Sequence, residues 1–450
     1  MPVYNPPLRD MQFVMHEVLN VTNDFKDMPQ HADTDADTIN AVLEEAGKFA
    51  KEVIFPLNIS GDTEGCTLNR ETHEVTTPKG FKEAYKTYVD GGWAALSCDP
   101  AFGGQGLPMV VNQCLYEMMN SANQAWTMYP GLTHGAYASL HTHGTPEQQA
   151  TYLHKMTSGE WTGTMCLTEP HCGTDLGLMR TKAEPQADGT YKITGNKIFI
   201  SAGEHDMADN IIHLVLARLP EAPAGTRGIS LFIVPKFLPN DDGTPGERND
   251  VKCVSIEHKM GIHASPTCVM SYGDDGGAVG YLVGEENQGM RAMFTMMNSA
   301  RSAVGIQGAA LGDAAYQKAL AYSQERRQGR EIGGDSKEPA FIISHPDVRR
   351  MLLFMRSHVE AMRALIVYNA AALDLSRALD GDEATAWGEI AELLTPVTKA
   401  WCTDVGMEVT STAVQVFGGM GYIEESGVAQ HYRDMRIAPI YEGTNGIQAM

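Results

Sequence analysis

The stretch Met165-Cys-Leu-Thr-Glu-Pro170, continued by Gly173-Thr174-Asp175, lies where the character of the chain changes. Before it, apolar residues recur at helical spacing, as they do between Ile39 and Val53. From about Thr164 onward the chain gives short β-type runs that turn residues separate. The stretch therefore predicts a boundary between a helical domain and a β domain.

The predicted strands after this boundary are short, and Asp- and Gly-rich turns such as Asp241-Asp-Gly243 separate them. This spacing suits a small antiparallel sandwich or barrel better than alternating strand-helix-strand units. We expect strands at residues 191–194, 197–201, 213–219, 229–234, 251–256 and 267–272.

After about residue 285 the chain is again helical, rich in Ala and Met and with Pro396 as its one internal proline within the expected helices. We expect those helices at residues 290–327, 345–379 and 383–417. The sequence thus predicts an α+β multidomain fold. Its parts are an N-terminal helical domain (1–163), a middle antiparallel β-sandwich or barrel (164–283) and a C-terminal helical bundle (284–450).

Composition narrows the class of protein. The 450 residues are 43% hydrophobic and 20% charged, which is typical of a globular protein with an ample core. A formal net charge of −22 argues against general binding to nucleic acid or to anionic membranes. No apolar run is long enough to cross a bilayer. The eight cysteines are scattered without a CxxC pair, so we expect reduced thiols in a cytoplasmic protein.

Two further motifs follow near the carboxyl terminus, Gln415-Val-Phe-Gly-Gly-Met-Gly-Tyr422 and Arg433-Asp-Met-Arg-Ile-Ala-Pro-Ile-Tyr-Glu-Gly-Thr444. Together with the Met165 stretch they resemble, in order and spacing, the signatures of the acyl-CoA dehydrogenase family. The resemblance extends over almost the whole chain. It implies the three-domain fold, FAD as the cofactor, and α,β-dehydrogenation of an acyl-CoA thioester to the trans-2-enoyl-CoA.

Such a reaction needs a carboxylate in a dry site beside the weakly acidic α-carbon of the thioester. By its position in the last motif, Glu442 matches the family's catalytic base. The alternative interpretation is an exposed Glu that precedes a Gly turn. Some members carry the base on an earlier helix, just before an arginine. Here that position is Ala300, ahead of Arg301, and Ala cannot accept a proton.

The resemblance also implies the flavin contacts. An aromatic-x-Ser pair is expected against the flavin ring, and Arg326 is expected to reach the pyrophosphate of a neighbouring subunit's cofactor. Gln328 stands where Thr is more usual, and two residues of the Gln415 motif approach the adenosine end from the partner chain. An alternative for Phe199 is ordinary sandwich core. The expected cofactor-binding residues are Cys166, Thr168, Phe199, Ser201, Arg326, Gln328, Gln415, Gly419 and Thr444.

For the substrate, the resemblance implies contacts from Thr174, Asn298 and Arg301. Asn298 replaces an acid that is common in relatives, and Gly446 stands where many relatives carry a flavin-contacting Gln or Glu. We predict no metal site, because no further ligands complete the His141-Thr-His143 pair.

Several phrases, among them His258-Lys-Met-Gly-Ile-His-Ala-Ser-Pro-Thr267, are similar to the branch of 3-methylmercaptopropionyl-CoA dehydrogenases. The expected substrate is therefore a short acyl-CoA or 3-(methylthio)propanoyl-CoA. That branch is usually longer, so we expect the chain to lack a C-terminal region. An electron-transfer flavoprotein is the expected acceptor, and a homodimer or homotetramer the expected assembly. The alternatives are an acyl-CoA oxidase and a non-catalytic scaffold of the same fold.

Overall fold

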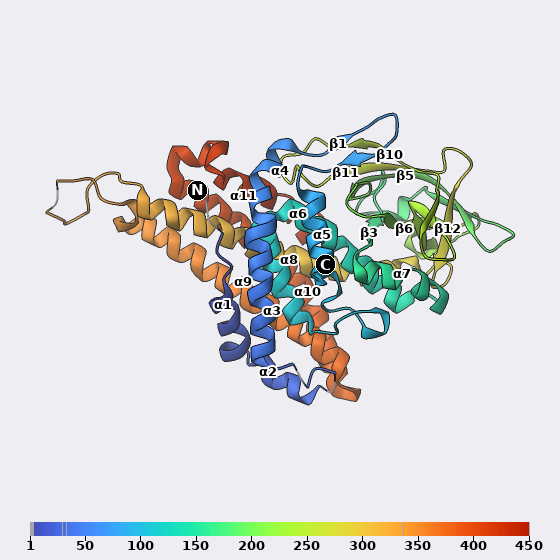
Figure 1. The fold of residues 1–450 in the computed structure, drawn as a ribbon, viewed down its shortest axis with the longest axis horizontal. Helices are drawn as coiled ribbons and strands as arrows, with labels where there is room; N and C mark the ends of the chain where they lie inside the picture. The colour runs from blue at the N-terminus through green and yellow to red at the C-terminus, as the bar shows by residue number, and fades with distance from the viewer. Residues whose placement is uncertain (1–3, 29, 33, 336, 450) are drawn as a thin grey trace.

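The computed structural model describes residues 4–28, 30–32, 34–335 and 337–449. A β-sheet lies at one side of the molecule and long helices cross the other side (Figure 1). The first 160 residues are mainly helical, as predicted. Their α-helices are α1 (Leu8–Gln12), α2 (Val21–Asp24), α3 (Ala36–Phe49), α4 (Asn58–Glu64), α5 (Phe81–Asp90), α6 (Met109–His143) and α7 (Pro146–Ser158).

Local sequence explains two features of these helices. Thr145 and Gln148 form a reciprocal capping box that begins α7, because each side chain bonds the backbone of the other residue. Helix α6 breaks at Asn123, whose backbone is non-helical (φ −159°, ψ 91°). The Asn123 side chain accepts from the N–H of Trp126 at 3.1 Å and donates to the carbonyl of Ile54 at 3.1 Å. Asn123 thus begins the second half of α6 as a helix cap does.

The middle of the chain forms an eight-stranded sheet with the order β10-β11-β5-β12-β7-β6-β3, in which β4 pairs with both β5 and β6. Because β4 links those two strands, the sheet closes on itself as a small barrel. Its strands are β3 (Trp161–Cys166), β4 (Lys182–Pro185), β5 (Tyr191–Ser201), β6 (Asn210–Arg218), β7 (Ile229–Pro235), β10 (Val251–Ile256), β11 (Thr267–Tyr272) and β12 (Ala278–Val283). Short hairpins pair β1 (Thr67–Leu68) with β2 (Val75–Thr76) and β8 (Phe237–Pro239) with β9 (Pro245–Arg248).

The predicted strands are confirmed, with two corrections. The two runs expected at 191–194 and 197–201 are one continuous strand, β5. The sheet is also not wholly antiparallel, because β3 pairs with β6 in parallel, with Trp161 opposite Asn210 and Cys166 opposite Val215. Strands β4 and β5 lie between β3 and β6 in the sequence, so local spacing of residues did not reveal this pairing.

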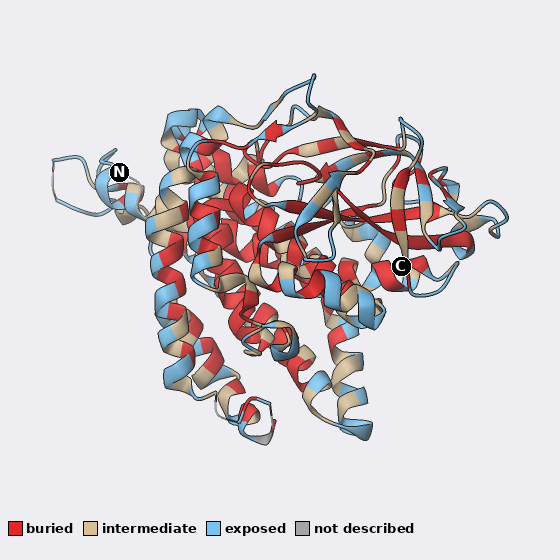
Figure 2. Ribbon diagram, turned by 45° about the vertical axis from the view of Figure 1, so that its right-hand side comes forward, coloured by how far each residue is buried: buried red, intermediate tan, exposed pale blue. Residues whose placement is uncertain are grey.

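The remaining helices are α8 (Gly289–Glu325), α9 (Pro346–Ala378), α10 (Gly381–Phe417), α11 (Val428–Met435) and α12 (Asn445–Gln448). The three long ones confirm the predicted helices to within two residues at each end. They pack against one another and against α6, so that buried residues follow the inner faces of the bundle (Figure 2). One large hydrophobic cluster joins the N-terminal helices to the bundle, and a second joins α6, α7 and α8 to the sheet.

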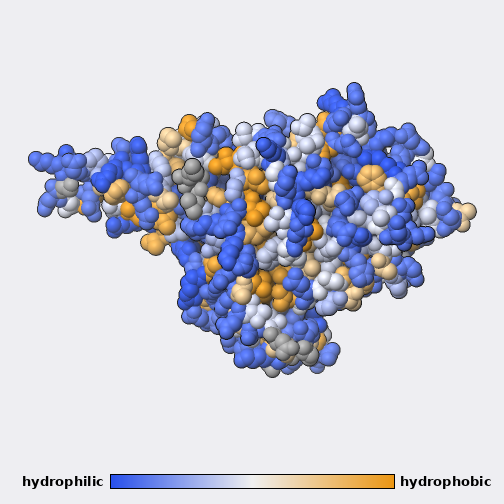
Figure 3. Space-filling view, viewed as in Figure 1, coloured by the Kyte–Doolittle hydropathy of each residue, from blue (hydrophilic) through white to orange (hydrophobic). Residues whose placement is uncertain are grey.

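The face seen in Figure 3 is mainly hydrophilic, with hydrophobic side chains gathered near its middle, over the helices. None of the helices that the structure describes combines the length and the apolar character needed to cross a membrane.

Candidate active site

Glu442 lies in a tight loop between α11 and α12, and α8 and α10 hold this loop from below. Its backbone is left-handed (φ 58°), as is that of Gly443 (φ 83°). Nε of Arg301 donates to the Glu442 carbonyl at 3.4 Å, and Nζ of Lys399 donates to the Gly443 carbonyl at 2.9 Å. Gln448 donates to both carbonyls, at 3.2 and 2.6 Å. One cation from α8, Arg301, and one from α10, Lys399, therefore fix the backbone that carries the carboxyl group.

The Glu442 carboxyl is partly buried, and the loss of hydration that follows raises its pKa to about 7. The nearby cations Arg301 and Lys399 act in the opposite direction, because they favour the ionised form. The Glu442 carboxylate is therefore neither fully exposed nor neutralised by a direct ion pair. A carboxyl with a pKa near neutral suits a general base.

The residue before the base is also anchored. The hydroxyl of Tyr441 donates to Oε1 of Gln307 on α8 in a short hydrogen bond. Behind it, Nε2 of Gln307 contacts the sulfur of Met128 on α6 at 3.5 Å. Burial raises the pKa of Tyr441 far above its ordinary value, so this phenol stays neutral.

The loop that follows β3 and carries Thr168 is held to strand β5 by a buried ion pair. Nζ of Lys197, fully buried in β5, donates to Oε1 of Glu169 at 2.9 Å and to the carbonyl of Leu167 at 3.0 Å. Glu169 also accepts from Thr181. The N–H of Ile198 donates to the Thr168 carbonyl at 2.8 Å. Thr168 is therefore fixed next to the end of β5.

Phe199 lies at that end of β5, and its two predicted environments were a contact with the flavin ring and ordinary sandwich core. Its ring is 60% exposed, so it is not sandwich core. Its backbone is left-handed (φ 60°), at a place where the pairing of β5 with β11 shifts register. Ser201 follows half-buried on the same strand, and its carbonyl accepts from the Thr164 hydroxyl at 2.7 Å. An exposed aromatic ring in a strained backbone beside Thr168 fits a surface for a flat ligand.

The remaining predicted residues of this region differ in exposure. The Cys166 thiol is buried in the barrel core and accepts from the Tyr272 hydroxyl at 3.1 Å. Any ligand contact of Cys166 must therefore come from its backbone. Thr174 and Thr444 are exposed, and Thr444 begins α12 as its N-cap. On α8, Oδ1 of Asn298 accepts from Arg301 at 3.1 Å, so these two predicted substrate residues lie together.

Four predicted cofactor residues lie elsewhere in the chain. Arg326 directly follows α8, 25 residues beyond Arg301. At 1.5 Å per residue this places them about 37 Å apart. The rings of Tyr322 and Phe417 stack with centroids 4.1 Å apart, which joins the ends of α8 and α10. At these ends lie four exposed residues that the sequence predicts to bind cofactor, Arg326, Gln328, Gln415 and Gly419.

The structure therefore divides the predicted residues into two groups. The first group lies around Glu442 and Arg301, on the α8 side of the bundle. The segment of α8 before Arg301 packs against the same hydrophobic cluster as Leu167, which precedes Thr168 in the chain. The other lies at the far end of α8. The helical residues of α8 between Arg301 and Arg326 separate the two groups.

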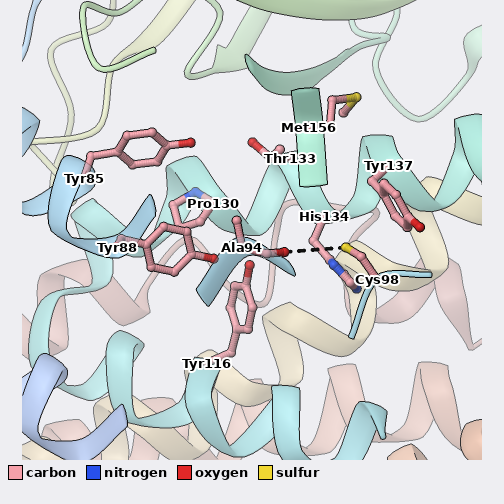
Figure 4. A pocket seen from close by; sticks show the side chains of 10 residues that line it. All are labelled: Tyr85, Tyr88, Ala94, Cys98, Tyr116, Pro130, Thr133, His134, Tyr137 and Met156. Atoms are coloured by element: carbon pink, nitrogen blue, oxygen red, sulfur yellow. Dashed lines mark hydrogen bonds between the residues drawn. The ribbon is translucent and has the colours of Figure 1, made fainter. Parts of the chain in front are cut away.

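A small cavity among the helices takes no part in this arrangement (Figure 4). Its volume is about 10 Å³, room for one water molecule at most. Burial lowers the pKa of His134 in its wall to about 4, which keeps the imidazole neutral. The lining residues are Tyr85, Tyr88, Ala94, Cys98, Tyr116, Pro130, Thr133, His134, Tyr137 and Met156.

His141 and His143 each have a partner of their own. Nε2 of His141 lies 2.9 Å from Asp99, and Nε2 of His143 lies 2.8 Å from the Thr295 hydroxyl. Among the described residues, Glu169, His171 and Cys172 could together face a metal ion. Glu169 already accepts from Lys197 on Oε1 and from the N–H of Arg180 on Oε2.

Sequence reasoning missed Lys399, Gln307 and Gln448. Lys399 carries a recognisable signal, because it falls on the helical spacing of the buried residues of α10, between Thr395 and Cys402. A lysine at such a position must find a buried acceptor. Gln307 and Gln448 gave no comparable signal.

The fold, helical then β-barrel then helical, carries two groups of predicted flavin and substrate residues. In order along the chain, family models match for the acyl-CoA dehydrogenase N-terminal domain (37–160), middle domain (164–274) and C-terminal domain (287–450). The chain belongs to the acyl-CoA dehydrogenase family, and it is an acyl-CoA dehydrogenase acting on CH–CH bonds.

Two relatives and one solved structure give the degree of similarity. The chain is 49% identical to the 3-methylmercaptopropionyl-CoA dehydrogenase of Ruegeria pomeroyi, over 99% of this chain and 75% of that protein. It is 40% identical to a butyryl-CoA dehydrogenase of Syntrophomonas wolfei, over 98% and 74% respectively. The structure of butyryl-CoA dehydrogenase from Megasphaera elsdenii is similar with a TM-score of 0.74 and 27% identity, over 92% of this chain and 96% of that one.

FAD is the cofactor of this family, and the residues present here fit it. Phe199 offers an exposed aromatic face next to Ile198, whose N–H bonds the Thr168 carbonyl. The substrate is an acyl-CoA.

Proposed function

We propose that this enzyme oxidises a short acyl-CoA, or 3-(methylthio)propanoyl-CoA, to the trans-2-enoyl-CoA, with Glu442 as the base. The observation that carries the proposal is the Glu442 carboxyl itself. Desolvation gives it a pKa of about 7, and the backbone on both sides of it is fixed. The names of the relatives at 49% and 40% identity support short acyl groups as the substrate class.

In this mechanism Glu442 removes the α-proton and holds it on its carboxyl group. The positive charge of Arg301 favours the ionised carboxylate before the transfer. Bound FAD would supply the hydride-accepting chemistry that an unactivated β C–H bond requires. Thr168, Phe199 and Ser201 would hold its ring, together with the Cys166 backbone and Thr444. Thr174, Asn298 and Arg301 contact the acyl-CoA.

We further propose that Arg326, Gln328, Gln415 and Gly419 bind the dinucleotide of a neighbouring subunit, in a homodimer or homotetramer. The separation of about 37 Å along α8 supports this division. An electron-transfer flavoprotein is the proposed acceptor. The eight cysteines, all free in the structure, support a reducing compartment, and we propose the cytoplasm.

The test is anaerobic bleaching of the flavin absorbance by propionyl-, butyryl-, longer acyl- and 3-(methylthio)propanoyl-CoA. We expect short substrates to bleach the wild type and a Glu425→Gln control, whose altered side chain is exposed. Glu442→Gln should retain FAD and show almost no bleaching. Equal bleaching in Glu442→Gln and wild type would refute the base assignment.

Two further readouts separate the alternatives. Steady peroxide formation without an added acceptor would identify an oxidase. A purified protein that is colourless and takes up no FAD would identify a non-catalytic scaffold.

A further inference from the structure

Lys399 is a buried ammonium directly beneath the loop that carries Glu442. Its side chain has no exposed surface, although it lies in the middle of α10. Nζ donates to the carbonyl of Gly443 at 2.9 Å and to Oδ1 of Asn445 at 2.7 Å. Burying an ammonium is costly unless its donors are satisfied, so these two bonds decide where the Gly443 and Asn445 groups lie.

The loop needs such support because its backbone is strained. Glu442 is a non-glycine residue with φ 58°, a conformation that is unfavourable for any residue with a Cβ atom. Asn445 extends the anchor, since its Nδ2 donates to Thr403 at 3.0 Å and to Asp404 at 2.8 Å on the same face of α10. Lys399 thus belongs to a set of α10 contacts that fixes the loop at Gly443 and Asn445.

Charge adds a second effect. The charged groups that face the base are Arg301 from α8 and Lys399 from α10, and Asp404 of α10 acts on Lys399. Both cations favour the ionised Glu442. Desolvation lowers the pKa of Lys399 to about 8, although Glu442 and Asp404 raise it. At neutral pH the Lys399 ammonium is therefore mostly charged.

We propose that Lys399 is a positioning residue for Glu442. Lys399 fixes the loop that carries the base and, through its charge, favours the ionised form of the Glu442 carboxyl. The inference rests on the proposed role of Glu442 as the base. Nothing in it requires Lys399 to touch the substrate or the cofactor. A residue that served only the packing of α10 would hold the fold without changing the titration of Glu442.

The experiment measures kcat/KM for butyryl-CoA against pH in holoenzyme, with Lys399→Met and Lys399→Arg as the variants. Lys399→Met removes charge and donors. Its ascending limb should move at least half a pH unit higher, and its limiting rate should fall at least tenfold. Lys399→Arg keeps the charge and should keep the limb near its wild-type pH while the limiting rate falls. Lys252→Met, in barrel strand β10, is the matched control and should behave as wild type.

The outcomes are distinguishable. A limb at the wild-type pH in Lys399→Met, with a limiting rate within twofold of wild type, overturns the inference. So does loss of FAD from both Lys399 variants, because Lys399 would then serve the fold. In either case an inactive Glu442→Gln leaves the proposed function standing. Full bleaching of Glu442→Gln would instead remove the proposed function.

Discussion

A change of pH from 6 to 8 should increase kcat/KM of the unmodified enzyme about tenfold. A base acts only in its ionised form, and kcat/KM reports the ionisation of the free enzyme. Burial gives Glu442 a pKa of about 7. Its ionised fraction then rises from about 0.1 at pH 6 to about 0.9 at pH 8, whereas an ordinary Glu with a pKa of about 4.3 is ionised at both.

The assay is the initial rate with butyryl-CoA at low concentration and an artificial electron acceptor. Binding of crotonyl-CoA, measured over the same range, is the control for pH effects on CoA recognition, because it requires no proton abstraction. We expect the affinity for crotonyl-CoA to change much less than kcat/KM. A kcat/KM that is flat from pH 6 to 8 would refute the desolvated carboxyl as the source of basicity.

Phe199→Ala should weaken FAD binding about threefold to tenfold, the value of one aromatic contact, as measured by flavin release on dilution. The control is Val254→Ala on barrel strand β10, where Val254 is also exposed. Unchanged retention of FAD in Phe199→Ala would contradict the proposed ring contact. Arg363→Met should cost about 3–5 kcal/mol and lower the thermal unfolding temperature of the holoenzyme, because it leaves Glu117 buried and unpaired. Arg350→Met, which breaks an exposed pair, should shift that temperature little, and equal shifts would count against the buried pair.

Periodicity was sufficient for the long helices and for most barrel strands, because each is defined by local spacing of apolar residues. Strand β3 pairs in parallel with β6, and no local pattern records which strands pair over that distance. The continuity of β5 was also hidden, because Gly195 interrupts its apolar alternation. The three domains were therefore predictable in kind and order, and the closure of the barrel was not.

The site divides in a similar way. Glu442, Arg301 and Thr168 belong to motifs, so the resemblance pointed to them. The exposure of Phe199 depends on a register shift between two strands, and the burial of the Cys166 thiol depends on Tyr272 from a distant strand. Lys399 acts on a loop 44 residues away. Tertiary packing decides each of these features, and sequence spacing alone does not.

The left-handed backbone of Glu442 has a consequence for the evolution of this position. Glycine or asparagine would adopt that conformation more easily, and either would spare the protein a desolvated negative charge. Variants chosen for thermal tolerance alone should therefore accumulate Gly or Asn at position 442. On the proposed role of Glu442 as the base, selection for turnover is what preserves an acidic residue at this position.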